Sequence, residues 1–225
     1  MLAKCFGEFV GTLMLVLLGD GVVANVLLKR SKAEGAGWMV ITSGWAFAVM
    51  AGVFTAIACG SSDAFINPAV TLGFAISSGD YSAAQLLGAF VGATLVWLHY
   101  LPHWKETSDT SMKLGIFCTG PAIRNVAANL ASEIIGTFVL VFVSAAIFSK
   151  AVAKGGLAAG LGPYLAGCVV WAIGLLLVGP PGMPLIQRVT SVRVSHTQCF
   201  PLPARATPIG VMHPSQSSAP WLVPV

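Results

Sequence analysis

Long apolar runs alternate with short polar segments along most of this chain. Five of the runs are close to the length of about 20 residues that a helix needs to cross the hydrocarbon of a bilayer. They cover approximately residues 6–28, 38–59, 83–101, 126–148 and 155–178, with polar or charged residues between them. The pattern predicts an all-α integral membrane protein with five visible spans.

One further apolar run is too short to cross a membrane. It covers residues 70–76 and follows a polar turn that leads into the triplet Asn67-Pro68-Ala69. Asparagine is a good helix N-cap and proline is favoured at the first helical position, so we expect a half-helix over residues 67–76. A half-helix at membrane depth is tolerated only where it is packed in protein or lines a watery path. We therefore expect a pore at this triplet.

The chain also contains an internal repeat. Residues 8–16, EFVGTLMLV, match residues 133–141, EIIGTFVLV, with Glu, Gly, Thr, Leu and Val in register. Three spans separate the starts of the two copies, and an odd number of spans per copy gives the copies opposite orientations. We predict an inverted repeat in which residues 1–101 form the first unit. Residues 102–125 are then a connecting loop, and residues 126–178 an incomplete second unit with two spans.

The composition changes abruptly at Gly179. Residues 179–225 hold nine of the thirteen prolines and no apolar run of spanning length, which is typical of a disordered tail. The genetic code offers a second interpretation, because a shift of one nucleotide allows residues 179–197 to be read as GPTGYAINPARDLGPRIAH. We predict that the reading frame slipped between about Leu175 and Gly179. A second half-helix and a sixth span would then have been lost to an aberrant tail.

Composition narrows the class of protein further. The chain is 56% hydrophobic and only 9% charged, whereas soluble domains carry about 25% charged residues. The net charge of +4 is small and does not indicate nucleic-acid binding. The five cysteines are scattered without a CxxC pair, so we expect neither a disulfide framework nor a metal site. Because no nucleophile–base constellation or phosphate loop is visible, we expect no cofactor and no enzyme activity.

Four motifs together resemble the major intrinsic protein family, which comprises the aquaporins and glycerol facilitators. They are EFVGT at residues 8–12, AFINPAVT at 64–71, AQLLGA at 84–89 and EIIGT at 133–137. The resemblance covers residues 2–178, and the shifted reading of the tail is similar to the glycerol-facilitator branch. It implies a passive channel for glycerol, other small uncharged solutes and water. It also implies a homotetramer in the lipid bilayer of the cell membrane.

The resemblance also implies roles for individual residues. Asn67 would donate a hydrogen bond from its side-chain amide to a passing solute. Pro68 and Ala69 would hold the helix start and its contact with the opposite triplet. Glu8 and Glu133 match the buried acids of the family, which accept hydrogen bonds from the half-helix loops.

An outer constriction is implied as well. Phe47, twenty residues before Asn67, would supply its aromatic ring, with Trp45 as the rival, and Gly174 would fall at the fifth-span position. Simple helix packing is the alternative for both Phe47 and Gly174. The chain departs from the family at Phe65, where a histidine is usual.

Two other functions remain open on the sequence alone. Inverted repeats and broken helices also occur in ion-coupled secondary transporters. The chain as written, without a second half-helix, is alternatively a non-functional channel product. A transporter would need a titrating acid on the substrate path, whereas Glu8 and Glu133 stand at repeat positions that suit a structural role.

Overall fold

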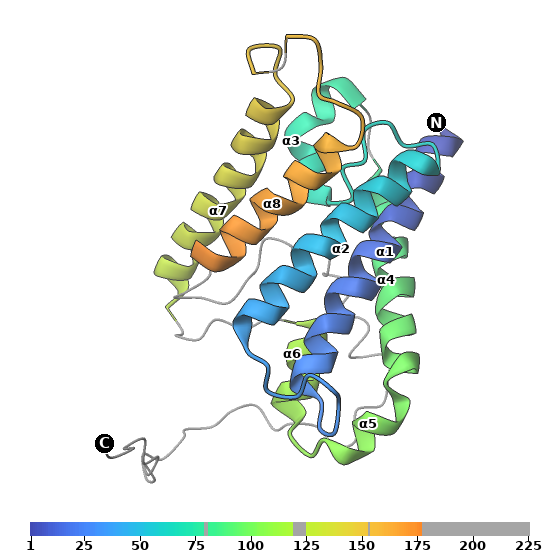
Figure 1. Ribbon diagram of the computed structural model, residues 1–225, viewed down its shortest axis with the longest axis vertical. Coiled ribbons are helices and arrows are strands. Elements are labelled where there is room, and N and C mark those ends of the chain that lie inside the picture. The colour runs from blue at the N-terminus through green and yellow to red at the C-terminus, as the bar shows by residue number, and fades with distance from the viewer. Residues whose placement is uncertain (79–80, 119–124, 153, 177–225) are drawn as a thin grey trace.

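The computed structural model describes residues 1–78, 81–118, 125–152 and 154–176, and these residues fold into eight helices (Figure 1). In chain order the helices are α1 (Leu2–Leu27), α2 (Trp38–Ala58), α3 (Pro68–Ser78), α4 (Ser82–His99), α5 (Leu101–Glu106), α6 (Thr110–Phe117), α7 (Val126–Ile147) and α8 (Leu161–Leu176). The predicted tail from residue 179 and its proposed frame slip lie outside the described residues.

Helix α1 packs closely against both α2 and α4, and these three helices form the best-packed part of the described residues (Figure 1). Glycines permit the close approach of α4 to α1. A Cβ at Gly88 would overlap the backbone oxygen of Phe9, and one at Gly92 would lie 2.6 Å from the backbone oxygen of Leu13. Small residues of this kind let two helix backbones approach within a membrane, where van der Waals packing drives association.

We expect Gly88→Ala to destabilise the protein, because the new methyl group must push α4 away from α1. Overpacking of this kind costs about 1–3 kcal/mol. Gly21→Ala in α1 is a matched control, since an added Cβ there meets no heavy atom of the described residues within 4 Å. Thermal unfolding in detergent should show a lower midpoint for Gly88→Ala than for Gly21→Ala. Equal midpoints would mean that α1 and α4 have room to accept the methyl group.

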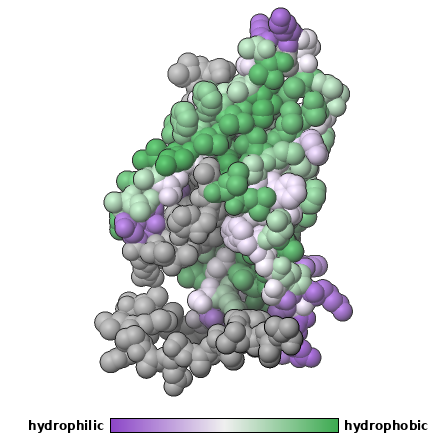
Figure 2. Space-filling model, turned by 60° about the vertical axis from the view of Figure 1, so that its left-hand side comes forward, coloured by the Kyte–Doolittle hydropathy of each residue, from purple (hydrophilic) through white to green (hydrophobic). Residues whose placement is uncertain are grey.

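Helices α7 and α8 form a second, more open pair. Helix α8 packs against α2 and α7, whereas α7 makes only a few contacts with α3 (Figure 1). Large apolar side chains on α7 are therefore exposed, namely Val126, Leu130, Ile134, Ile135, Phe138 and Phe142. Figure 2 shows apolar residues over much of one face of the molecule, with hydrophilic residues toward its ends. Such a surface is suited to lipid or to packing against other membrane helices.

Four of the five predicted spans are long and apolar enough to cross a membrane, namely α1, α2, α4 and α7. The fifth was predicted to begin at residue 155, but α8 begins at Leu161 and has 16 residues. Residues 155–160 are apolar but non-helical, and Gly156 and Gly160 adopt left-handed backbone angles, with φ of 83° and 80°. Glycine supports that conformation at little cost, so hydropathy alone placed the start of the fifth span too early.

The connecting segment over residues 102–125 was predicted as a loop, and this prediction is wrong in part. It contains most of α5 and all of α6, and α6 packs against α1. Asp109 caps α6 by accepting hydrogen bonds from the backbone nitrogens of Ser111 and Met112. The rings of Trp104 and Phe117 stack with centroids 5.8 Å apart, which holds α5 and α6 together.

Glu34 organises the turn between α1 and α2. Its carboxylate accepts hydrogen bonds from Lys29 Nζ at 2.7 Å and from the backbone nitrogen of Arg30 at 2.8 Å. The Lys29 ammonium, together with the Arg30 N–H, holds the pKa of Glu34 below its ordinary value. Arg30 has φ of 62°, a conformation that is uncommon for residues other than glycine, so this bond holds a strained turn.

We expect this turn to loosen in acid. A carboxylate with a lowered pKa gives stability that is present above its ordinary pKa and lost as the pH falls through the folded-state pKa. Below about pH 4, where an ordinary glutamate becomes protonated, the amide protection factor of Arg30 should therefore fall. Glu34→Gln lacks the titrating group and should show no such step. The same acid-induced step in both proteins would contradict this role for Glu34.

Candidate solute pathway

A short helix begins at the Asn-Pro-Ala triplet. Helix α3 starts at Pro68 and has 11 residues, so it rises about 16 Å and cannot cross the hydrocarbon. Asn67 Oδ1 accepts a hydrogen bond from the backbone nitrogen of Ala69 at 2.9 Å, and the Asn67 carbonyl accepts one from Thr71 at 2.9 Å. Asn67 is therefore the N-cap residue, and the free N–H groups and positive dipole end of α3 lie beside it.

Glu8 holds the loop that leads into α3. This acid on α1 is fully buried and accepts four hydrogen bonds. Oε1 receives Ser61 Oγ at 2.6 Å and the backbone nitrogen of Phe65 at 2.9 Å. Oε2 receives the backbone nitrogen of Ile66 at 2.8 Å and Gln85 Nε2 at 2.8 Å. A buried carboxylate is costly unless such donors satisfy it, so Glu8 and the loop fix one another.

The loop backbone is strained where Glu8 holds it. Ala64 and Ile66 both have φ of 44°, in the left-handed region that non-glycine residues occupy at a cost of about 1–3 kcal/mol. Ser61 Oγ also accepts the backbone nitrogen of Ala64 at 3.1 Å, while Gln85 Nε2 reaches Thr71 Oγ1 at 2.8 Å. The network therefore ties α1, the loop, α3 and α4 into one unit and sets the position of Asn67.

A second group of polar residues anchors the outer part of the same loop. Asp63 Oδ2 forms an ion pair with Lys4 Nζ at 3.0 Å and accepts a hydrogen bond from the Tyr81 hydroxyl at 3.4 Å. Lys4 lies at the start of α1, and Tyr81 directly precedes α4. The loop is thus held at two places. Glu8 holds it inside the helix bundle, and the contacts of Asp63 with Lys4 and Tyr81 hold it near the end of the bundle.

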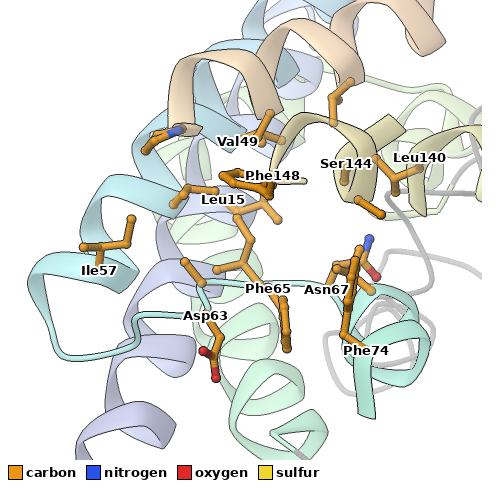
Figure 3. Close-up of a pocket in the computed structure, with 18 of the residues that line it drawn as sticks. Leu15, Val49, Ile57, Asp63, Phe65, Asn67, Phe74, Leu140, Ser144 and Phe148 are labelled. Carbon is orange, nitrogen blue, oxygen red and sulfur yellow. The ribbon is translucent and has the colours of Figure 1, made fainter. Parts of the chain in front are cut away.

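A cavity of about 470 Å³ opens beside Asn67 (Figure 3). The loop and α3 form one side, and side chains of α1, α2, α7 and α8 form the rest. Most of the lining is apolar, for example Val49, Leu140 and Phe148. Asn67 is 7% exposed, and its side-chain amide points into this space (Figure 3). The cavity therefore offers a held amide donor within a mainly apolar wall.

Comparison with known proteins identifies the family. A protein-family model described as Major intrinsic protein matches residues 1–185. The chain belongs to the major intrinsic protein family. It is accordingly a multi-pass membrane protein of a channel family and not an enzyme.

Individual relatives agree with this family membership. The chain is 48% identical over 206 residues to the Probable glycerol uptake facilitator protein of Thermotoga maritima, covering 88% of this chain and 85% of the relative. It is 50% identical over 201 residues to Glycerol uptake facilitator protein 3 of Lactiplantibacillus plantarum, covering 86% and 81%. The fold resembles the X-ray structure of the aquaglyceroporin from Plasmodium falciparum. There the TM-score is 0.72 at 24% identity, covering 88% of this chain and 84% of that one.

The two residues predicted for the outer constriction lie apart from the Asn67 cavity of this major intrinsic protein. Phe47 on α2 is 64% exposed and does not line the cavity. Gly174 on α8 is buried, and its carbonyl accepts a hydrogen bond from Trp38 Nε1 at 3.0 Å. The rival residue Trp45 is 2% exposed and would clash with a Cβ at Gly19, so it packs against α1. A constriction role for Phe47 and Gly174 remains a prediction.

The two repeat-related acids differ in their surroundings. Glu133 on α7 is half-buried, and its backbone carbonyl accepts a hydrogen bond from Thr137 Oγ1 at 2.8 Å. Glu8 contacts a described loop instead, and the loop partner implied for Glu133 would belong to the undescribed tail. The structural role of Glu133 therefore stays a prediction.

Sequence reasoning missed the polar partners of Glu8. Ser61 and Gln85 are both fully buried, although Gln85 stood in a motif that supported the family resemblance. A glutamine within an apolar span needs hydrogen-bond partners, and that requirement was the available signal. Ser61 carried no such signal, because serine in a polar turn is ordinary.

Proposed function

We propose that this chain is a passive channel for glycerol and similar small uncharged solutes, with water as a second permeant. The observation that carries the proposal is the Asn67 amide, which the Glu8 network holds inside an apolar cavity. The names of the two bacterial relatives favour glycerol as the solute.

The chemistry of the cavity suits a polyol. A hydroxyl oxygen can accept a hydrogen bond from the Asn67 amide while the carbon backbone of the solute contacts the apolar wall. The positive end of α3 disfavours cations at the same point, because its free N–H groups carry partial positive charge. An uncharged solute with both hydroxyl and C–H surfaces therefore fits best.

The arrangement of acids supports passive transport over ion coupling. Among the described residues that line the cavity, the one carboxylate is Asp63, and it is paired with Lys4. Glu8 uses both of its oxygens to accept donors from the loop and from Gln85. Both acids therefore make contacts that hold the loop in place, which suits a structural role better than a change of partner during a transport cycle.

Tracer uptake into liposomes containing the full chain tests this proposal. We expect initial rates of glycerol uptake that rise linearly with concentration and do not change when proton or sodium gradients are collapsed. Uptake that stops on adding a protonophore, while the liposomes stay intact, would favour a coupled transporter. Uptake equal to that of empty liposomes would favour the non-functional product.

We also propose that residues 179–225 are the product of a slipped reading frame, and that the native chain carries a second Asn-Pro-Ala half-helix and a sixth span. The shifted reading of residues 179–197 supports this proposal. Sequencing the gene across codons 175–180 tests it, because an intact frame that encodes the tail as written would disprove it.

The homotetramer implied by the family stays a prediction, which the mass of the protein–detergent complex would check.

A further inference from the structure

Two phenylalanines form an aromatic pair in the wall of the cavity. The rings of Phe65 and Phe74 lie nearly parallel, with an interplanar angle of 15° and centroids 5.5 Å apart, and both residues line the cavity. This distance is within the range of a stacked contact. Phe65 belongs to the loop and Phe74 to α3, so the pair joins the two parts of the half-helix segment.

The pair is held in place beside the solute donor. The backbone nitrogen of Phe65 donates a hydrogen bond to Glu8 Oε1. This bond fixes the backbone position from which the Phe65 ring projects. Along the chain Phe65 lies midway between Asp63 and Asn67, and Figure 3 shows both rings on the Asp63 side of the Asn67 amide. A solute that moves between Asn67 and the Asp63 end of the cavity therefore passes the aromatic pair.

Ring faces offer different solutes different contacts. A water molecule beside the rings gives up hydrogen bonds that phenylalanine cannot replace, so an apolar wall of this kind disfavours water. A three-carbon polyol is longer than one water molecule. It can place C–H groups against the rings while a hydroxyl remains bonded to the Asn67 amide.

We propose that the Phe65–Phe74 pair is a selectivity element that favours small polyols over water. The inference rests on the proposed channel function and deepens it by naming the residues that set the ratio of the two permeants. It predicts that a polar atom placed on either ring admits water more readily, because water then regains a hydrogen-bond partner at this step.

The test compares osmotic water permeability and glycerol permeability in the same liposomes, for the full chain and three variants. In Phe65→His the ratio of water to glycerol permeability should rise about threefold or more, since the imidazole ring brings polar atoms to the apolar cavity wall. Phe74→His should change the ratio in the same direction, and it replaces Phe65→His in the test if that variant fails to fold. Phe65→Leu keeps the wall apolar and should leave the ratio close to that of the unaltered chain.

The outcomes separate this inference from the proposed function. If the unaltered chain conducts glycerol but both histidine variants keep its ratio, the selectivity role is wrong and the channel function stands. A ratio that rises equally in Phe65→Leu would also overturn the inference, because ring size and not polarity would then set it. If the unaltered chain conducts neither solute, the proposed function fails and the inference fails with it.

Discussion

Glu8→Gln is expected to produce the largest loss of stability of any single isosteric change in the described part of the chain. An amide group has one acceptor oxygen, so the donors now bonded to one carboxylate oxygen would face an N–H₂ group. Those donors are Ser61 and Phe65 on Oε1, or Ile66 and Gln85 on Oε2. Each buried donor left without an acceptor costs about 1–3 kcal/mol, so we expect a loss of about 2–6 kcal/mol.

The strained loop adds to the effect. Ala64 and Ile66 keep their left-handed conformation because the Glu8 network holds the surrounding loop. We therefore expect amide protection across residues 60–67 to fall in Glu8→Gln, together with the thermal midpoint in detergent. Glu106→Gln is the matched control, because Glu106 forms an exposed ion pair with Arg30, and such pairs contribute about 0–1 kcal/mol. Equal midpoints for the two variants would contradict the role of Glu8.

Asn67→Asp is expected to reduce glycerol permeability strongly while leaving the helix start intact. An aspartate oxygen can still cap α3 at the backbone nitrogen of Ala69. The second oxygen replaces the amide nitrogen, so the solute hydroxyl no longer has a donor and meets a negative charge. Removing one partner of a buried hydrogen bond costs about 1–3 kcal/mol, which corresponds to about tenfold in rate near the lower end of that range.

Comparing Asn67→Ala with Asn67→Asp separates the capping role of this residue from its role as a hydrogen-bond donor. It removes both the cap and the donor, so it should lower stability by about 1 kcal/mol and also reduce permeability. Thermal unfolding and liposome permeability are measured for both variants. If Asn67→Asp conducts glycerol as well as the unaltered chain, the amide is only a cap and the solute pathway lies elsewhere.

Features set by local sequence were predictable. Hydropathy placed α1, α2, α4 and α7 within a few residues of their bounds, because a membrane-crossing helix needs a long apolar run. The start of α3 followed from the capping chemistry of Asn67 and Pro68. These predictions depended on neighbouring residues alone.

Features set by distant contacts were not predictable in the same way. The four donors to Glu8 come from residues 53 to 77 positions away, and no local pattern pairs them. The direction of Phe47 depends on which neighbours cover α2, and its 64% exposure could not be read from its spacing to Asn67. The cap at Asp109, in contrast, was a readable helix start that the prediction of a loop overlooked.

Osmotic re-swelling of liposomes measures whether glycerol enters by way of Asn67. Liposomes containing the full chain are mixed with hypertonic glycerol, and light scattering follows their shrinkage and the re-swelling that accompanies glycerol entry. We expect re-swelling faster than in empty liposomes, and slowed about tenfold by Asn67→Asp at equal protein content. Re-swelling no faster than in empty liposomes, from protein shown to be folded and inserted, would contradict the account of Asn67 as the donor of a glycerol channel.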